Sequence, residues 1–293
     1  MKQSRILTAL ALAFAAWFAL PAEAQQVVRV GSKNFTEQFV LAELYAQALE
    51  ANGIKVEKKL NLGGTLIAHK ALEEKQIDFY PEYTGTILIA VMKQPPVTDP
   101  KTVYDRVKAD YAARGLVVLN EAPVNNTYNM VVRPETAAQY KLETLSDLAK
   151  VAKDLKVGAG PEFRDRADGL PGLKSKYGIE FKEDLQMAIG LRYQAIANKQ
   201  VDVVNGYATD GMISALKLKR LTDDKNLWPP YYVVPVVRKE TLDANPKIAE
   251  VLNRVSATLD EAVMAEMNFK VDGDKMEPKD VARDFLKAKG IVK

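Results

Sequence analysis

The sequence predicts an α/β protein of two lobes, each built on a mainly parallel sheet, with the backbone crossing between the lobes twice. Strand patterns alternate with helix patterns along most of the chain, which is typical of parallel sheets. About 269 residues follow an N-terminal leader, more than one hydrophobic core usually holds. Extended segments near Asn125 and Val233 interrupt the alternation twice, as two crossover segments would.

The first 24 residues have the pattern of a secretory signal peptide. Lys2 and Arg5 form a positive start, and Ile6–Leu20 is an apolar run shorter than the ~20 residues of a membrane span. Residues 22–24 (AEA) form a small-x-small cleavage site. We expect cleavage after residue 24 and export to a periplasm, with an N-terminal anchor helix as the alternative.

Composition excludes several classes of function. The chain has no cysteine, which excludes disulfides, thiol catalysis and lipid attachment through an N-terminal cysteine. Without the leader, 39 basic residues stand against 37 acidic ones, and the charges are interspersed. This balance does not indicate the strongly basic surface that binds nucleic acid or anionic lipid.

The first lobe begins with two strand and helix units. Residues 27–32 (VVRVGS) read as a strand, and apolar side chains at helical spacing predict a helix over residues 34–53, with Thr36 as a possible cap. A second strand over residues 56–62, a GGT turn and a helix over residues 65–76 repeat the plan. The apolar IDFY follows, and residues 98–115 predict one more amphipathic helix.

The second lobe is expected after two extended pieces split by Pro123. Residues 144–155 predict a helix capped by Thr144 or Ser146, and residues 200–221 read as strand, turn and helix. A strand with prolines at its entry and middle (WPPYYVVPVVRKE) leads back, and helices dominate from Thr241 onward. We therefore assign residues 25–124 and 235–293 to lobe 1 and residues 125–234 to lobe 2.

The segment DFYPEYTGT, residues 78–86, places two tyrosines in a turn that has little interior to fill. Ligands of open α/β sheets bind beyond the carboxyl ends of the strands. Four tyrosines fall at such strand ends or at the crossings, which indicates that their rings face a ligand: Tyr83, Tyr128, Tyr207 and Tyr231.

At this point the sequence resembles a known family. The stretches VGSKNFTEQ, DFYPEYTGT, NNTY, EFRDRADGLPGL, VDVVNGYATDG and PPYYVVPVVR occur in family order and cover nearly all of the chain after the leader. Together they are similar to the periplasmic binding proteins for glycine betaine, choline and carnitine, of the OsmF, OpuBC and ProX type. The resemblance implies a type II periplasmic binding fold whose lobes close on a trimethylammonium ligand and deliver it to an inner-membrane ABC permease with its ATPase.

The resemblance also implies roles for single residues. The tyrosine cage around the ammonium would be Tyr83, Tyr128, Tyr207 and Tyr231. The carboxylate and other polar groups of the ligand would meet Lys33, Thr86, Arg166 and Asn126. Some relatives carry an acidic residue at the position of Asn126, so we expect less negative charge beside the cation here.

The chemistry of the residues agrees with this assignment. A quaternary ammonium has no N–H to donate, so ring faces hold it, each contributing ~0.5 to 2 kcal/mol when desolvated. A guanidinium such as that of Arg166 offers a planar donor pair to a carboxylate, and Lys33 offers a point charge. Lys33 could instead only cap the first strand turn.

Two alternatives remain at this point. An exported hydrolase has little support, because the chain has no G-x-S-x-G motif, no cysteine and one histidine. The same fold could also bind an amino acid, a polyamine or a small anion. We expect a monomeric solute receptor that is not an enzyme and needs no metal or cofactor.

Overall fold

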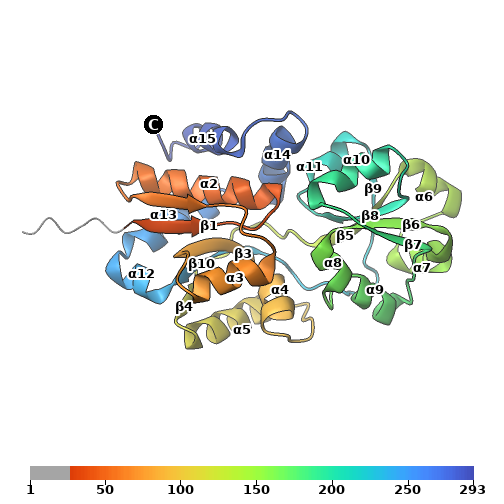
Figure 1. The fold of residues 1–293 in the computed structure, drawn as a ribbon, viewed down its shortest axis with the longest axis horizontal. Helices are drawn as coiled ribbons and strands as arrows, with labels where there is room; N and C mark the ends of the chain where they lie inside the picture. Colours follow the sequence, from red (N-terminus) through yellow and green to blue (C-terminus); the bar gives the residue numbers. More distant parts are fainter. Residues whose placement is uncertain (1–26) are drawn as a thin grey trace, which may run out of the picture.

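Each lobe contains a five-stranded sheet, and the two lobes lie side by side (Figure 1). The computed structural model describes residues 27–293, so the expected signal peptide (residues 1–24) lies outside the described residues. The boundaries that we assigned to the lobes, 124/125 and 234/235, stay a prediction.

The lobe 1 sheet has the order β2-β1-β3-β10-β4. β1 is parallel to β2 and β3, whereas β10 is antiparallel to β3 and β4. The sheet is therefore mixed rather than mainly parallel, because β10 enters from the other lobe and runs back along its neighbours. The strands are β1 (Val28–Gly31), β2 (Val56–Lys59), β3 (Phe79–Tyr83), β4 (Leu116–Val118) and β10 (Val233–Arg238).

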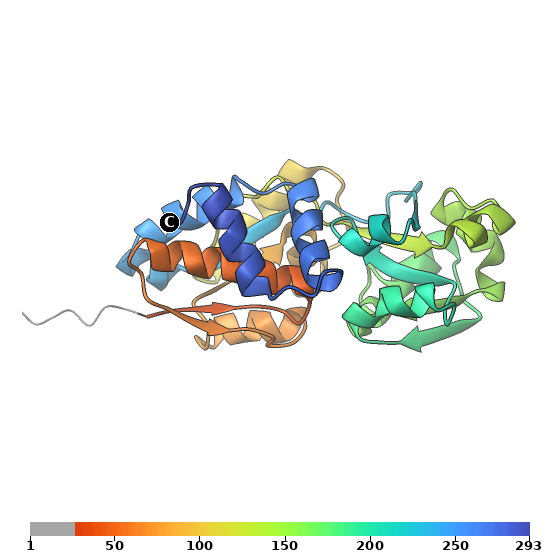
Figure 2. The same cartoon turned by 90° about the horizontal axis from the view of Figure 1, so that it is seen from above.

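Helices cover this sheet on both sides, and the C-terminal helices belong to the same lobe (Figure 2). α13, α14 and α15 all pack against α2, which Figure 2 shows under the blue C-terminal segment. The helices are α2 (Thr36–Ala51), α3 (Thr65–Glu73), α4 (Thr84–Thr86), α5 (Pro100–Ala113), α12 (Lys239–Ala244), α13 (Lys247–Ser256), α14 (Glu261–Asp272) and α15 (Pro278–Ala288), with a π-helical turn at Ile87–Val91.

The lobe 2 sheet has the order β7-β6-β8-β5-β9 and is mixed in the same way. β6 is parallel to β7 and β8, and β5 is antiparallel to β8 and β9. The elements are β5 (Tyr128–Val132), α6 (Pro134–Tyr140), α7 (Leu145–Val151), β6 (Lys156–Ala159), α8 (Pro161–Asp165), α9 (Leu170–Tyr177), β7 (Glu183–Gln186), α10 (Arg192–Ala197), β8 (Val203–Tyr207), α11 (Gly211–Ala215) and β9 (Lys219–Leu221), with 3-10 turns at Ala152–Asp154 and Ile189–Leu191.

Helix caps test the local predictions. Thr144 caps α7 in a reciprocal capping box with Asp147, as predicted. The predicted cap Thr36 is wrong: α2 begins after Phe35, and the Thr36 hydroxyl donates instead to Asp272 Oδ1 of α14 at 2.6 Å. The hydroxyl that the local pattern assigned to capping the helix thus bonds to a distant residue of another helix instead.

Two segments connect the lobes, as the sequence predicts. One leads from β4 to β5 and the other from β9 to β10, and the two run side by side between the lobes, where the Asn126 N–H donates to the Tyr231 carbonyl at 3.0 Å. Within residues 27–293 no helix combines the length and the apolar character needed to cross a bilayer.

Candidate functional site

The ends of strands bring the four predicted tyrosines together between the lobes. Tyr128 opens β5 and Tyr207 closes β8, and the two are direct partners in the antiparallel ladder. Tyr83 closes β3, and Tyr231 lies on the second crossover segment just before β10. Both lobes and one crossover segment therefore contribute rings to one place.

A close approach at Gly85 explains why the aromatic turn ends in Thr-Gly-Thr. A Cβ at Gly85 would lie 2.6 Å from the Pro230 carbonyl oxygen and 2.7 Å from the Tyr231 ring. In addition, the Thr84 N–H donates to the Tyr232 carbonyl at 3.0 Å. A residue without a side chain at this position lets the Tyr83 turn pack directly on the crossover that carries Tyr231.

The rings form a connected cluster. Tyr128 lies 5.3 Å from Tyr207 and 5.5 Å from Tyr231, measured between ring centroids. Phe35 links this group to Tyr83, because its ring stacks on Tyr207 at 5.7 Å and on Tyr83 at 6.3 Å. Phe35 falls among the apolar side chains whose helical spacing predicted a helix over residues 34–53, and that spacing does not distinguish a residue that faces the core from one just before the helix start.

All eight predicted site residues line one cavity. It has a volume of about 30 Å³. Phe35 and Glu162, which the sequence analysis did not single out as site residues, complete its wall. The predicted lining residues are Lys33, Tyr83, Thr86, Asn126, Tyr128, Arg166, Tyr207 and Tyr231.

Both cations of the cavity lie near ring faces and pair with internal carboxylates. Lys33 Nζ lies 4.7 Å from the Tyr83 ring centroid and donates to Glu82 Oε1 at 2.5 Å. The Arg166 guanidinium lies 5.7 Å from the Tyr128 centroid and makes a two-pronged contact with Asp168 at 2.6 and 2.8 Å. A ligand carboxylate would therefore add to these ion pairs rather than meet free cations.

Asp168 also fixes a ring of the cage. The Tyr231 hydroxyl donates to Asp168 Oδ2 at 2.5 Å, and the indole N–H of Trp228 donates to the Asp168 carbonyl at 2.8 Å. Asp168 is almost fully buried. It thus orients Arg166 and Tyr231 together.

Burial keeps the cage rings neutral. It raises the pKa of Tyr83, Tyr128 and Tyr231 well above the ordinary value for tyrosine, and it raises the pKa of Tyr207 to about 12 although Arg192 acts in the opposite sense. At neutral pH the site therefore presents phenol rings, whose negative faces attract cations.

Glu162 joins the two lobes at the rim of the cavity. From α8 in lobe 2, its carboxylate accepts from the backbone N–H of Thr65 and, at 3.0 Å, from the Thr65 hydroxyl. Thr65 is the first residue of α3 in lobe 1, where the helix dipole favours an anion. A Cβ at Gly64 would clash with this carboxylate, so glycine is required at that position for the contact.

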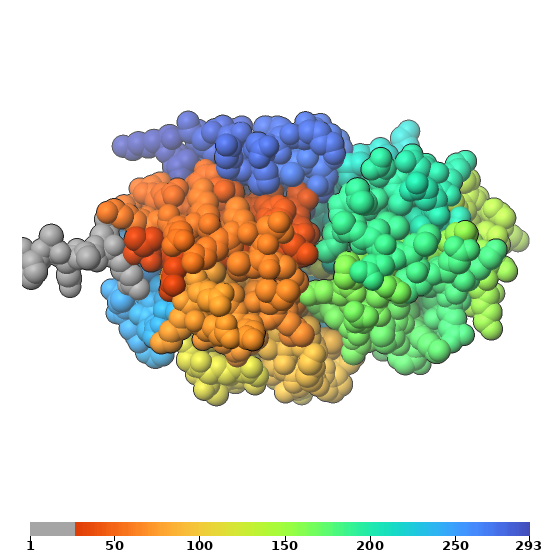
Figure 3. Space-filling model, in the orientation of Figure 1, coloured from red at the N-terminus to blue at the C-terminus, as the bar shows by residue number. Residues whose placement is uncertain are grey.

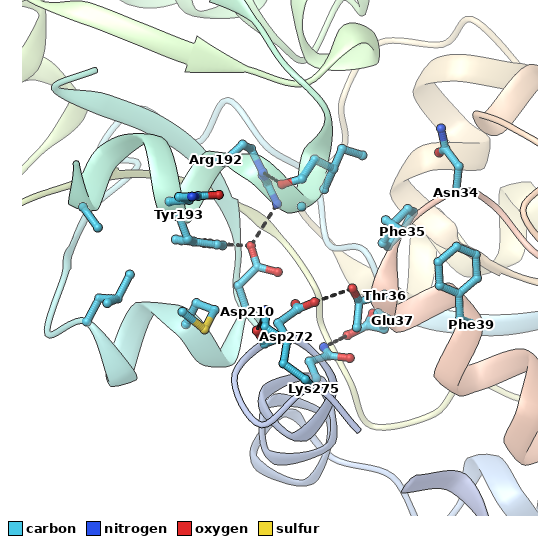
Figure 4. Close-up of a pocket in the computed structure, with 17 residues that line it drawn as sticks. Asn34, Phe35, Thr36, Glu37, Phe39, Arg192, Tyr193, Asp210, Asp272 and Lys275 are labelled. Atoms are coloured by element: carbon cyan, nitrogen blue, oxygen red, sulfur yellow. Dashed lines mark hydrogen bonds and ion pairs between the residues drawn. The ribbon is translucent and has the colours of Figure 1, made fainter. Parts of the chain in front are cut away.

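A larger hollow of about 570 Å³ lies next to the cage and shares Phe35 with it (Figure 4). It belongs to the furrow between the lobes that Figure 3 shows. Arg192 lies between this hollow and the cage: its guanidinium is 4.8 Å from the Tyr207 centroid and 3.3 Å from Asp210 Oδ2. The Tyr207 ring therefore also packs beside an ion pair.

Among residues 27–293 no cluster of histidine, aspartate and glutamate has the arrangement of a metal site. The described cavity instead combines ring faces with charged hydrogen-bonding groups.

Comparisons with known proteins identify the family. Residues 26–288 match the family described as the substrate binding domain of ABC-type glycine betaine transport systems. The chain is 38% identical to a glycine-betaine-binding protein of Pseudomonas aeruginosa, over 97% of this chain and 94% of the relative. It is 33% identical to the carnitine transport binding protein OpuCC of Listeria monocytogenes, over 91% and 88%.

A solved structure agrees with these relatives. A crystal structure described as a glycine betaine/carnitine/choline ABC transporter superposes with a TM-score of 0.75 at 33% identity, covering 90% of this chain and 99% of that chain. The type II periplasmic binding fold expected from the sequence is confirmed.

Proposed function

The chain belongs to the family of substrate-binding domains of ABC-type glycine betaine transport systems, and on this premise we propose that its tyrosine cage captures a quaternary ammonium solute. The ligand class is that of glycine betaine, choline and carnitine. The observation that carries the proposal is the meeting of four tyrosine rings from both lobes and one crossover segment around a single cavity.

The geometry supports capture by lobe closure. A cavity of about 30 Å³ is small beside a solute of seven or more heavy atoms, and we expect the ligand to enter when the lobes move apart. Closing then brings Tyr83 against the ligand from one side and Tyr128 and Tyr207 from the other. The ligand stabilises the closed form because it binds that form more tightly than the open one, and the difference comes from contacts that exist only after closure.

The remaining roles follow from the same premise. Tyr83, Tyr128, Tyr207 and Tyr231 surround the ammonium, and the polar end of the ligand meets Lys33, Thr86, Arg166 and Asn126. The protein acts in the periplasm after cleavage of its signal peptide, as a monomer without catalytic activity. It delivers the solute to an inner-membrane permease that is driven by an ATPase.

Titration calorimetry with Tyr207→Ala tests the cage. Tyr207 is only partly buried, and no hydrogen bond to its hydroxyl occurs in the described part of the chain, so its truncation removes a ring face at little cost in stability. We expect at least a tenfold loss of affinity for the solute that the wild type prefers, the scale of one desolvated ring face. Tyr232→Ala, on the neighbouring residue of the same crossover as Tyr231 but outside the cavity, is the control and retains affinity.

Competition decides between the quaternary ammonium class and another cargo. A cage of ring faces prefers a trimethylammonium compound to its dimethyl and primary-amine analogues, because the methylated cation is bulky and weakly hydrated. Equal affinity for all three would favour an amino acid or polyamine as the cargo.

A further inference from the structure

Within residues 27–293, Glu37 is a buried carboxylate that makes no ion pair. It lies in the first turn of α2, and only 3% of its surface is exposed. Five acidic residues are buried in the described part of the chain, and four of them pair with lysine or arginine. Those four are Glu43, Asp78, Glu82 and Asp168, whereas no ion pair involves Glu37.

Four neutral donors hold this carboxylate. Glu37 Oε1 accepts from the Tyr83 hydroxyl and from the Asn126 side-chain amide, each at 2.8 Å. Glu37 Oε2 accepts from the Asn268 side-chain amide at 2.9 Å and from the Thr209 hydroxyl. These donors come from lobe 1, lobe 2 and the first crossover segment, so they fix the carboxylate where the lobes meet.

Burial raises the pKa of Glu37, whereas the hydrogen bonds from Thr209, Asn268 and Tyr83 stabilise its ionised form. A buried anion that is solvated only by neutral groups makes its surroundings favourable for a cation. Tyr83 and Asn126 both line the cavity, and both donate to the same oxygen of Glu37. The negative charge therefore lies one hydrogen bond behind the cage wall. Of the other acidic groups next to the cage, Glu82 and Asp168 are already neutralised by Lys33 and Arg166, and Glu162 accepts from Thr65 across the lobes with the Arg166 guanidinium 3.8 Å away.

We propose that Glu37 supplies the counter-charge for the cation bound in the cage and that it acts through Tyr83 and Asn126. This inference rests on the proposed function. Glu37 is a positioning residue, since it does not line the cavity. Its effect has two parts: its charge attracts the cation directly, and a phenol that donates to a carboxylate presents a more negative ring face.

The proposal also changes the reading of Asn126. From the sequence, an asparagine at this position indicated less negative charge beside the ligand than an acidic residue would give. The structure places the carboxylate of Glu37 directly behind the Asn126 amide. The charge is present, but it comes from a helix 89 positions earlier in the chain.

The test compares a trimethylammonium compound with the isostere in which carbon replaces the charged nitrogen. Choline is paired with 3,3-dimethyl-1-butanol, and glycine betaine with 3,3-dimethylbutanoate; the pair used is the one whose trimethylammonium compound the wild type binds better. Calorimetry gives the ratio of the two Kd values for the wild type and for Glu37→Gln, which keeps the shape of the side chain and removes its charge. We expect the preference for the trimethylammonium compound to fall at least tenfold, the scale of one unit charge ~10 Å away at an effective dielectric constant of about 20.

Glu43→Gln is the matched control. Glu43 lies on the same helix and is similarly buried, but it pairs with Lys58 at 2.7 Å, and in the described part of the chain it accepts from no residue that lines the cavity. We expect this variant to retain the wild-type ratio. Should Glu37→Gln fail to fold, Tyr83→Phe removes the phenol that transmits the effect, and the same ratio should fall.

Two results would overturn the inference. If Glu37→Gln weakens the cation and the isostere equally, or changes neither, Glu37 has only a structural role, while the proposed function stands. If the wild type binds no quaternary ammonium compound, the proposed function and this inference both fail.

Discussion

Replacing Glu162 by alanine should shift the lobes toward the open form even without ligand. Glu162 is the carboxylate of lobe 2 that accepts from the backbone N–H and the hydroxyl of Thr65 in lobe 1. The variant removes both hydrogen bonds and leaves the first N–H of α3 to water once the furrow opens. No residue of the ring cluster is altered.

The expected size follows from the environment of the two partners. A hydrogen bond to a charged group contributes about 1.5 to 3 kcal/mol when buried, and a carboxylate at a helix N-terminus adds about 0.3 to 1 kcal/mol. Thr65 is 1% exposed, but 38% of the Glu162 side chain is exposed, so solvent screens the pair. We take about 1.5 kcal/mol for the whole contact, which is about a tenfold shift of the equilibrium between closed and open lobes.

The assay is single-molecule fluorescence transfer between one dye on each lobe, measured without ligand. Gly64→Ala should disrupt the same contact from lobe 1, because the added Cβ would clash with the Glu162 carboxylate. Gly190→Ala is the matched control, since a Cβ at Gly190 meets no heavy atom within 4 Å. An unchanged distribution of distances in both Glu162→Ala and Gly64→Ala would refute a closing role for this contact.

Three further outcomes are expected from the structure. Gly85→Ala should lower the free energy of unfolding by about 1 to 3 kcal/mol in urea titrations and weaken ligand binding, because its Cβ displaces the Tyr231 ring. A variant as stable as the wild type would contradict the close approach. Asp168→Asn should cost about 3 kcal/mol of stability, since Arg166, whose side chain is 10% exposed, would lose its carboxylate partner, whereas a loss below about 1 kcal/mol would mean that the ion pair is dispensable. Burial, with a smaller contribution from Asp105, raises the pKa of Glu121 to about 7. A carboxyl group whose pKa is higher in the folded protein destabilises the fold as pH rises from about 4.5 through 7. Glu121→Gln should therefore raise stability by about 1 kcal/mol at pH 8, a value reduced because the group is half exposed, and leave it unchanged at pH 4.5; an equal gain at both pH values would exclude this cause.

The sequence by itself determined most helices and strands, because the pattern that predicts each of them lies within a few neighbouring residues. Strand and helix periodicity predicted β1, α2, α3 and the helices after Thr241, and the capping box at Thr144 was predicted correctly. The direction of β10 was not predictable in this way, because pairing direction depends on the path by which the chain returns from the other lobe. The sheets are mixed for that reason.

Some residues of the site could likewise be predicted from the sequence, and others could not. The eight predicted residues line one cavity, because strand ends and motif stretches mark them in the sequence and the fold brings strand ends together. Phe35, Glu37 and Glu162 lie in the same motif stretches but not at strand ends, and neither a phenylalanine just before a helix nor a glutamate within a helix stands out from its local pattern. Their partners lie 46 to 231 positions away for Glu37 and 97 positions away for Glu162. Such pairings exist only after the lobes dock, so they are decided by the tertiary structure and not by any local pattern.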